Sequence, residues 1–109
     1  MRVQIAARHC EVPATVLTRT QEQLEKLQRY DPRVSGAEVV FETEKHLKKV
    51  EAVVKVDRQE PLVAGGEGVE FRDALDQMVD RLGRMLRKRR SQKKDQYRPA
   101  TSEPGLPEE

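Results

Sequence analysis

Apolar and polar residues alternate along four stretches of the chain, and this alternation predicts four β-strands. Residues 2–10, 37–44 and 49–57 each place apolar side chains on one face and polar ones on the other, as half-buried strands do. Residues 45–48, between the second and third strands, are predicted to form a hairpin loop. Residues 61–67 predict a shorter fourth strand, which one proline and two glycines weaken.

Two other segments repeat apolar residues every three or four positions, which predicts amphipathic helices. The first covers residues 13–29, and the following Asp31-Pro32 pair stops it from continuing. Its thin apolar stripe consists of Val16, Thr20, Leu24 and Leu27, with Tyr30 closing it. The second covers residues 70–90 and has a denser stripe formed by Phe71, Ala74, Leu75, Met78, Val79, Leu82, Met85 and Leu86.

The predicted order is β-α-β-β-β-α, an α+β arrangement. Each strand has one apolar face and each helix one apolar stripe. The simplest solution is therefore two layers, a four-stranded sheet with two helices on one face. The connection through the first helix should make the first two strands parallel, with the remaining pairs antiparallel. We assign residues 1–94 to this domain. Residues 95–109 hold three prolines and few apolar side chains, so we expect a disordered acidic tail.

Composition narrows the class of protein. The 109 residues suit one small domain, and 37% of them are charged, against about 25% in an average protein. A single cysteine allows no internal disulfide. Neither an apolar run long enough for a membrane span nor a signal-peptide pattern is present. We therefore expect a protein of the reducing cytoplasm, without a membrane partner.

The charge is unevenly distributed along the chain. Residues 1–80 have 12 basic and 15 acidic side chains, and residues 95–109 have one basic and four acidic ones. Between them lie eight basic residues and no acidic one: Arg81, Arg84, Arg87, Lys88, Arg89, Arg90, Lys93 and Lys94. A solvated helix end that satisfies the helix dipole is the simpler explanation, but the dipole offers each cation only tenths of a kcal/mol. The cluster therefore predicts a polyanionic partner.

The kind of polyanion follows from what the cluster lacks. No aromatic residue lies within residues 81–94, so base stacking is not the predicted mode. Arginine and lysine on two ridges of one helix suit phosphates, which favours recognition of the backbone and shape of structured RNA.

No combination of residues predicts catalysis or metal binding. His9 and Cys10 are strand neighbours that point to opposite faces, and His46 lies in a predicted loop. Three aspartates on the second helix (Asp73, Asp76 and Asp80) are predicted to form surface salt bridges. Residues 65–68 lack the spacing of a phosphate-binding loop and predict instead a close passage of backbone past a helix. We expect no enzyme activity, no cofactor and no small-molecule substrate.

The second helix carries a family resemblance. Residues 67–76 (EGVEFRDALD) and 79–88 (VDRLGRMLRK) resemble the ribosome hibernation-promoting factor / ribosome-associated inhibitor family, whose pattern there is approximately E-x-x-D-M-Y-A-A-I-D and then V/I-D-K-L-x-R-Q-L/I-x-K. Further matches are Val3-Gln4-Ile5, Arg8-His9, Glu11-Val12, Glu25-Lys26-Leu27 and Tyr30. The resemblance covers residues 2–94. The chain departs from it at Arg72, Phe71 and Arg19, where the family has Tyr, Met and an apolar residue.

The resemblance implies binding to the small ribosomal subunit and its rRNA near the decoding region. Family members there occupy space that mRNA and tRNA need, and they stop translation reversibly in stationary phase or stress. Matching positions make Arg8, Lys26, Arg81, Arg84, Arg87 and Lys88 candidate rRNA contacts, and charge alone adds Arg89, Arg90, Lys93 and Lys94. The chain resembles the family's short form and is expected to be monomeric when free. Whether it pairs ribosomes or keeps them single is not predicted.

Two other functions fit the same residues. A general double-stranded-RNA-binding module also packs two helices on one face of a sheet, and it would bind bare duplexes nearly as well as ribosomes. A protein-interaction adaptor would dock the basic helix on an acidic partner and show no dependence on RNA.

Overall fold

The computed structural model describes the backbone of residues 1–95 and the side chains of residues 1–90. The order of elements is the predicted one: β1 (Arg2–Arg8), α1 (Ala14–Tyr30), β2 (Val34–Glu44), β3 (Leu47–Val56), β4 (Leu62–Gly68) and α2 (Phe71–Asp95). The strands form one sheet in the order β1-β2-β3-β4. β1 runs parallel to β2, and the other two pairs are antiparallel.

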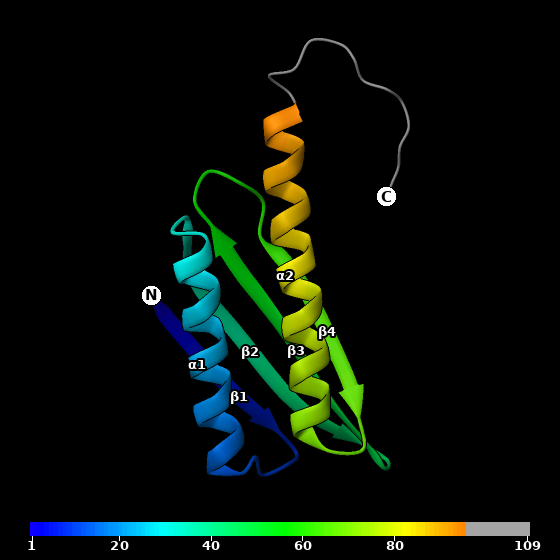
Figure 1. Ribbon diagram of the computed structural model, residues 1–109. Coiled ribbons are helices and arrows are strands. Elements are labelled where there is room, and N and C mark those ends of the chain that lie inside the picture. Colours follow the sequence, from blue (N-terminus) through cyan, green and yellow to red (C-terminus); the bar gives the residue numbers. More distant parts are fainter. Residues whose placement is uncertain (96–109) are drawn as a thin grey trace.

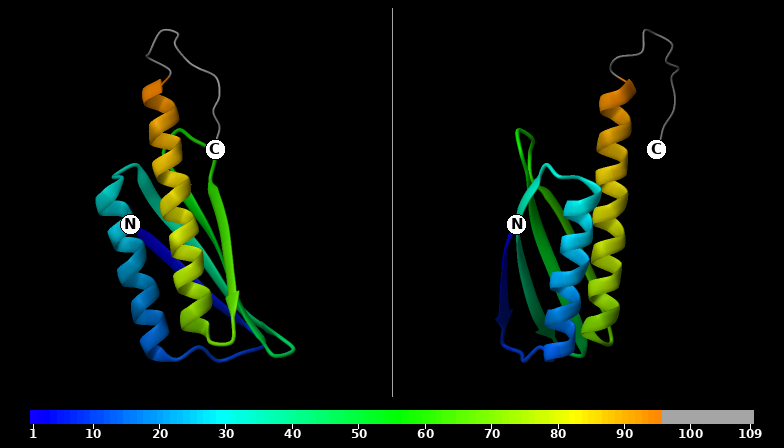
Figure 2. Two further views of the ribbon diagram at one scale, coloured as in Figure 1. Left: turned by 45° about the vertical axis from the view of Figure 1, so that its right-hand side comes forward. Right: turned by 60° about the vertical axis from the view of Figure 1, so that its left-hand side comes forward.

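Both helices cover the same face of the sheet and leave the other face open (Figures 1 and 2). The predicted α+β class and two-layer arrangement are therefore confirmed. The layers follow from the alternation in the strands, because Ala37, Val39 and Phe41 of β2 all point towards the helices and are buried. Their neighbours Glu38, Val40 and Glu42 lie on the open face, exposed or half-buried.

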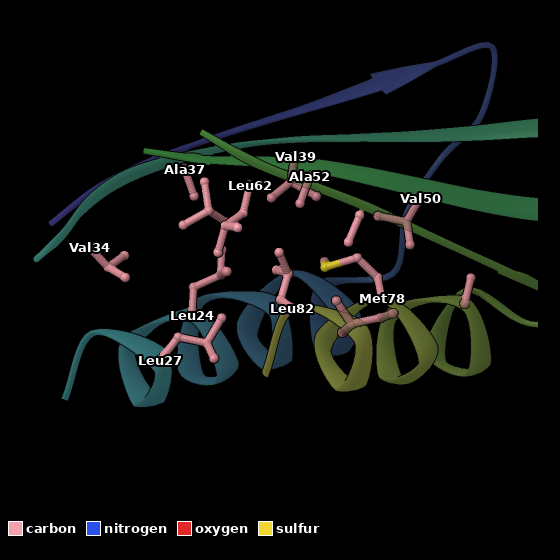
Figure 3. Close-up of a cluster of buried hydrophobic side chains, with 14 of the residues drawn as sticks. Leu24, Leu27, Val34, Ala37, Val39, Val50, Ala52, Leu62, Met78 and Leu82 are labelled. Atoms are coloured by element: carbon pink, nitrogen blue, oxygen red, sulfur yellow. The ribbon is translucent and has the colours of Figure 1, made fainter. Parts of the chain in front are cut away.

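The core fills the space between the sheet and the two helices (Figure 3). From α1 it takes Leu24 and Leu27, and from α2 it takes Met78 and Leu82, all at most 8% exposed. The predicted stripe of α1 is confirmed for Val16, Thr20, Leu24 and Leu27. Tyr30 was expected to close this stripe, and that prediction is wrong. Tyr30 is 44% exposed, and its ring meets Arg90 of α2 instead of the sheet-facing core.

Several predicted boundaries also change. β2 begins at Val34, three residues before the predicted start, because Val34 already pairs with Val56 of β3. β1 ends at Arg8, since His9 adopts a φ of 56° that breaks the extended backbone. The hairpin loop shortens to Lys45 and His46, and Glu44 pairs directly with Leu47. α2 continues to Asp95, five residues past the expected end and one residue past the predicted domain boundary. The remainder of the predicted tail, residues 96–109, lies outside the described residues.

The glycines of β4 allow α2 to approach the sheet closely. A Cβ atom at Gly66 would lie 2.1 Å from the carbonyl oxygen of Ala74 and 2.9 Å from the backbone nitrogen of Met78. No side chain fits there, so backbone passes against backbone, as the sequence predicted for residues 65–68. The contact brings α2 onto the sheet at the edge strand β4.

Side chains of α2 also protect the free edge of β4. Arg81 donates a hydrogen bond from Nη1 to the Gly65 carbonyl oxygen at 2.6 Å, and the Glu67 amide donates to Oε1 of Gln77 at 3.0 Å. Both backbone groups would otherwise be open to strand pairing with another chain. One cation of the basic cluster is therefore engaged in holding the sheet edge.

A buried carboxylate fixes the end of α1. Asp31 is 2% exposed and accepts three hydrogen bonds from Arg33. The backbone amide and Nε of Arg33 donate to Oδ1, and Nη2 donates to Oδ2. The side-chain hydrogen bonds from Arg33 lower the pKa of Asp31 below its ordinary value of 3.8, against the opposing effect of burial. Asp31 also ends the helix, because its amide donates to the Leu27 carbonyl.

We predict that Asp31→Asn lowers the free energy of unfolding at pH 7 by about 2 kcal/mol, a typical value for hydrogen bonds to a charged group. Because the folded-state pKa is depressed, this stability is present above the unfolded-state pKa and is lost as pH falls through the folded value. The difference between wild type and variant should therefore shrink below about pH 4. Urea denaturation at pH 7 and pH 3 measures this difference in the free energy of unfolding. Asp57→Asn, at an exposed turn, is the control, and a difference that grows in acid would contradict the prediction.

Candidate RNA-binding surface

The two helices lie side by side and point in the same direction (Figures 1 and 2). Arg19 Nε on α1 is 2.9 Å from Asp76 Oδ1 on α2, and Arg90 Nη1 on α2 donates to the Tyr30 carbonyl oxygen at 3.0 Å. Arg19 and Tyr30 are about three turns apart on one helix, and Asp76 and Arg90 are about four turns apart on the other. Each pair of positions therefore shares one side of its helix, and the two helices adjoin along their length.

The exposed cations of α2 lie on the side away from the sheet. Arg84 Nη2 is 2.7 Å from Asp80 Oδ2, an exposed pair one turn apart that contributes little stability. Arg87 and Lys88 are exposed, and neither has a hydrogen-bond or ion-pair partner among the described side chains. Among the described side chains, Arg87 and Lys88 are therefore open to an external anion, and Arg84 is held only by its exposed pair with Asp80.

Two other predicted contacts are used inside the protein. Arg81 caps the edge of β4, as described above. Arg89 is half-buried and donates from Nη1 to the Glu60 carbonyl oxygen at 2.6 Å and to Gln59 Oε1 at 3.2 Å. It therefore ties the C-terminal half of α2 to the turn between β3 and β4. Counting charges along the sequence did not distinguish these arginines from Arg87.

The C-terminal ends of the helices bring residues of α1 to the basic cluster. Arg90 reaches Tyr30 of α1, and Lys26 lies one turn before Tyr30 on the same side of that helix. We call Lys26, Arg84, Arg87, Lys88 and Arg90 the basic helical surface, since all five are exposed. The side chains of the candidates Lys93 and Lys94 lie outside the described residues.

Arg8 does not join this surface. It ends β1 on the open face of the sheet, opposite Glu42, and lines a hollow of about 400 Å³ together with Glu51, Glu67 and Arg81. Lys49 also lines this hollow, so acidic and basic side chains line it in equal number, Arg8 included. The open face of the sheet therefore mixes both signs of charge, whereas cations gather on the basic helical surface, and this asymmetry would orient the protein towards a polyanion. The roles of Arg8 and of the other candidate contacts stay predictions.

The arrangement also reveals residues that sequence analysis did not connect. Arg72 of α2 and Arg19 of α1 line the same depression of about 420 Å³, near the N-terminal ends of the helices. Both residues are departures from the family pattern. Tyr30 was assigned to the core, and its contact with Arg90 was not foreseen. Its position one turn after Lys26 was the available signal, because residues four apart share a helix face.

Neither helix, over the residues that the structure describes, combines the length and the apolar character needed to cross a membrane. Within the same part of the chain, no group of three or more His, Cys, Asp and Glu side chains is placed to hold a metal ion.

These features define a small α+β domain with a basic helical face. The chain belongs to the family described as sigma 54 modulation protein / S30EA ribosomal protein, whose family model matches residues 3–94. A ribosome hibernation promoting factor of Pseudomonas putida is 30% identical over 88 residues, 81% of this chain and 85% of that protein. A factor of the same name from Azotobacter vinelandii is 29% identical over 105 residues, 94% of this chain and 97% of that protein. The family resemblance predicted from the sequence is confirmed.

Solved structures share the fold. A ribosomal subunit interface protein from Coxiella burnetii superposes with a TM-score of 0.77 at 21% identity, covering 84% of this chain and 99% of that chain. The N-terminal domain of Thermus thermophilus Protein Y gives a TM-score of 0.72 at 21% identity, covering 81% and 98%. At such identities the likeness concerns the architecture and not the site.

Proposed function

We propose that this protein is a ribosome hibernation factor that binds the small ribosomal subunit through the phosphates of its rRNA. It acts in the cytoplasm as a monomer and places the basic helical surface against rRNA near the decoding region. There it occupies space that mRNA and tRNA need, so translation stops reversibly in stationary phase or stress. It acts by occupying space and carries out no reaction.

The exposed Arg87 and Lys88, without partners among the described side chains, carry this proposal. The guanidinium of Arg87 can bind a phosphate through two parallel N–H groups, and the ammonium of Lys88 supplies a compact charge. The last turns of α2 extend past the sheet, so this helix can enter a narrow channel (Figure 1). The names of the relatives from Pseudomonas putida and Azotobacter vinelandii support hibernation as the setting.

Cosedimentation with purified small ribosomal subunits tests the proposal. We expect the protein to pellet with the subunits and to remain bound in the presence of excess generic duplex RNA, since the subunit offers a larger complementary surface. Equal competition by duplex RNA would favour the double-stranded-RNA-binding module. Pelleting from lysate that persists after RNase treatment would favour the protein-interaction adaptor.

We predict that this binding is dominated by phosphate contacts and therefore depends steeply on salt. About six such contacts give a slope of log affinity against log salt near −5 by the rule for duplex DNA. Affinity measured for purified subunits between 50 and 300 mM KCl gives the slope, which should approach this value. A slope shallower than about −2 would show that charge does not drive binding.

A further inference from the structure

An exposed aromatic ring lies at the edge of the basic helical surface. Tyr30 is the last residue of α1 and is 44% exposed. The guanidinium carbon of Arg90 lies 4.9 Å from the centre of the Tyr30 ring, within the range of a cation–π contact. Nη1 of the same arginine donates to the Tyr30 carbonyl oxygen at 3.0 Å, so the planar group is held at two points.

We propose that Tyr30 and Arg90 form a stacking platform for one unpaired base of an RNA ligand. The proposal rests on the proposed function, since it adds a base contact to a surface that binds phosphates. It changes the expectation from the sequence, in which residues 81–94 contain no aromatic side chain and base stacking was not predicted. The fold supplies the missing ring from a different helix.

The geometry suits a base more than a purely structural contact. RNA-binding proteins stack unpaired bases on aromatic rings and on arginine guanidinium planes, and Tyr30 and Arg90 bring one of each together at an exposed position. A contact that served only to join the helices would gain most from burying the ring, whereas Tyr30 remains nearly half exposed. Lys26, one turn earlier on the same side of α1, is placed to meet the phosphate of the stacked nucleotide.

Tyr30→Leu and Tyr30→Phe separate stacking from charge. Leucine removes the ring and keeps an apolar side chain, whereas phenylalanine keeps the ring. We expect Tyr30→Leu to weaken binding to small ribosomal subunits about tenfold, within the range for loss of one stacked base. The loss should be the same factor at every salt concentration, because stacking releases no counterions. Tyr30→Phe should bind as wild type does.

Three outcomes overturn the platform. These are wild-type affinity for Tyr30→Leu, an equal loss for both variants, or a loss for Tyr30→Leu that fades as salt rises. Circular dichroism melting shows whether each variant is folded. If Tyr30→Leu does not fold, Arg90→Lys replaces it, since lysine keeps the charge and removes the planar group. Arg90→Lys should then lose affinity severalfold, and wild-type affinity would overturn the proposal.

A single-stranded RNA oligonucleotide containing 2-aminopurine tests the same contact without ribosomes. Stacking quenches the fluorescence of this base analogue, so wild type and Tyr30→Phe should quench it and Tyr30→Leu should not. Absence of quenching by wild type overturns the platform. If wild type fails to bind subunits but quenches the oligonucleotide through Tyr30, the proposed function fails and the platform stands.

Discussion

The double variant Arg87→Glu and Lys88→Glu is expected to bind small ribosomal subunits at least about 100-fold more weakly than wild type. Two attractive phosphate contacts become two repulsions. The salt dependence should fall by about two units of slope, since the log–log slope follows the number of neutralised phosphates. Both side chains are exposed and have no partner among the described residues, so the melting temperature should stay within about 2 °C of wild type. Equilibrium binding at several salt concentrations and thermal melting measure these quantities.

The matched control reverses the same number of charges on the other side of the molecule. Arg2→Glu with Lys55→Glu changes two exposed cations on the open face of the sheet, where neighbouring strands present Glu38 and Glu51. This control should bind nearly as wild type does, apart from a uniform long-range effect that salt screens. Equal losses in the two double variants would mean that net charge, and not the basic helical surface, governs binding.

Gly66→Ala is expected to destabilise the domain severely, although it removes no side chain from the core. The new Cβ would lie 2.1 Å from the Ala74 carbonyl oxygen, and the obstructing atoms are backbone that cannot rotate aside. α2 must move off β4, which opens the core around Leu75 and Met78. We expect a cost above about 3 kcal/mol, beyond ordinary overpacking. For a domain of this size the melting temperature would then fall by about 12–24 °C.

Gly65→Ala provides the control for Gly66→Ala. Its Cβ would meet the Val50 carbonyl oxygen at 3.3 Å, a slight crowding that a small backbone shift relieves. Thermal and urea unfolding of both variants should therefore separate a mild change at position 65 from a severe one at 66. Similar stabilities would contradict the close contact between α2 and β4. Since α2 carries most of the basic helical surface, Gly66→Ala should also weaken subunit binding.

The fold was largely determined by the sequence, because burial imposes a period on each element. Ala37, Val39 and Phe41 alternate with polar residues, and Val16, Thr20, Leu24 and Leu27 repeat at helical spacing. These periods indicate which side of each element is buried. The order β-α-β-β-β-α then allows few ways to pack the helices against the sheet. The ends of elements were less certain, since they depend on single backbone conformations such as the positive φ of His9.

The composition of the site was also predictable, whereas its arrangement was not. The concentration of charge within residues 81–94 is a property of the sequence alone. Which of those cations are free depends on what lies next to them in space. Arg81 meets a carbonyl 16 residues away, Arg89 meets one 29 residues away, and Arg90 meets one 60 residues away. Helical periodicity places a side chain on its own helix and says nothing about the neighbouring element.

The sequence by itself therefore determined the layers, the family and the basic helix of this protein. Only the tertiary structure decided that Arg87 and Lys88 have no partner among the described side chains, that Arg8 lies on the opposite face, and that Tyr30 adjoins Arg90. The physical reason is the range of the interactions. Burial repeats locally along the chain, at every second residue in a strand and at every third or fourth in a helix. Hydrogen bonds and stacking instead join residues that only the packing of distant segments brings together.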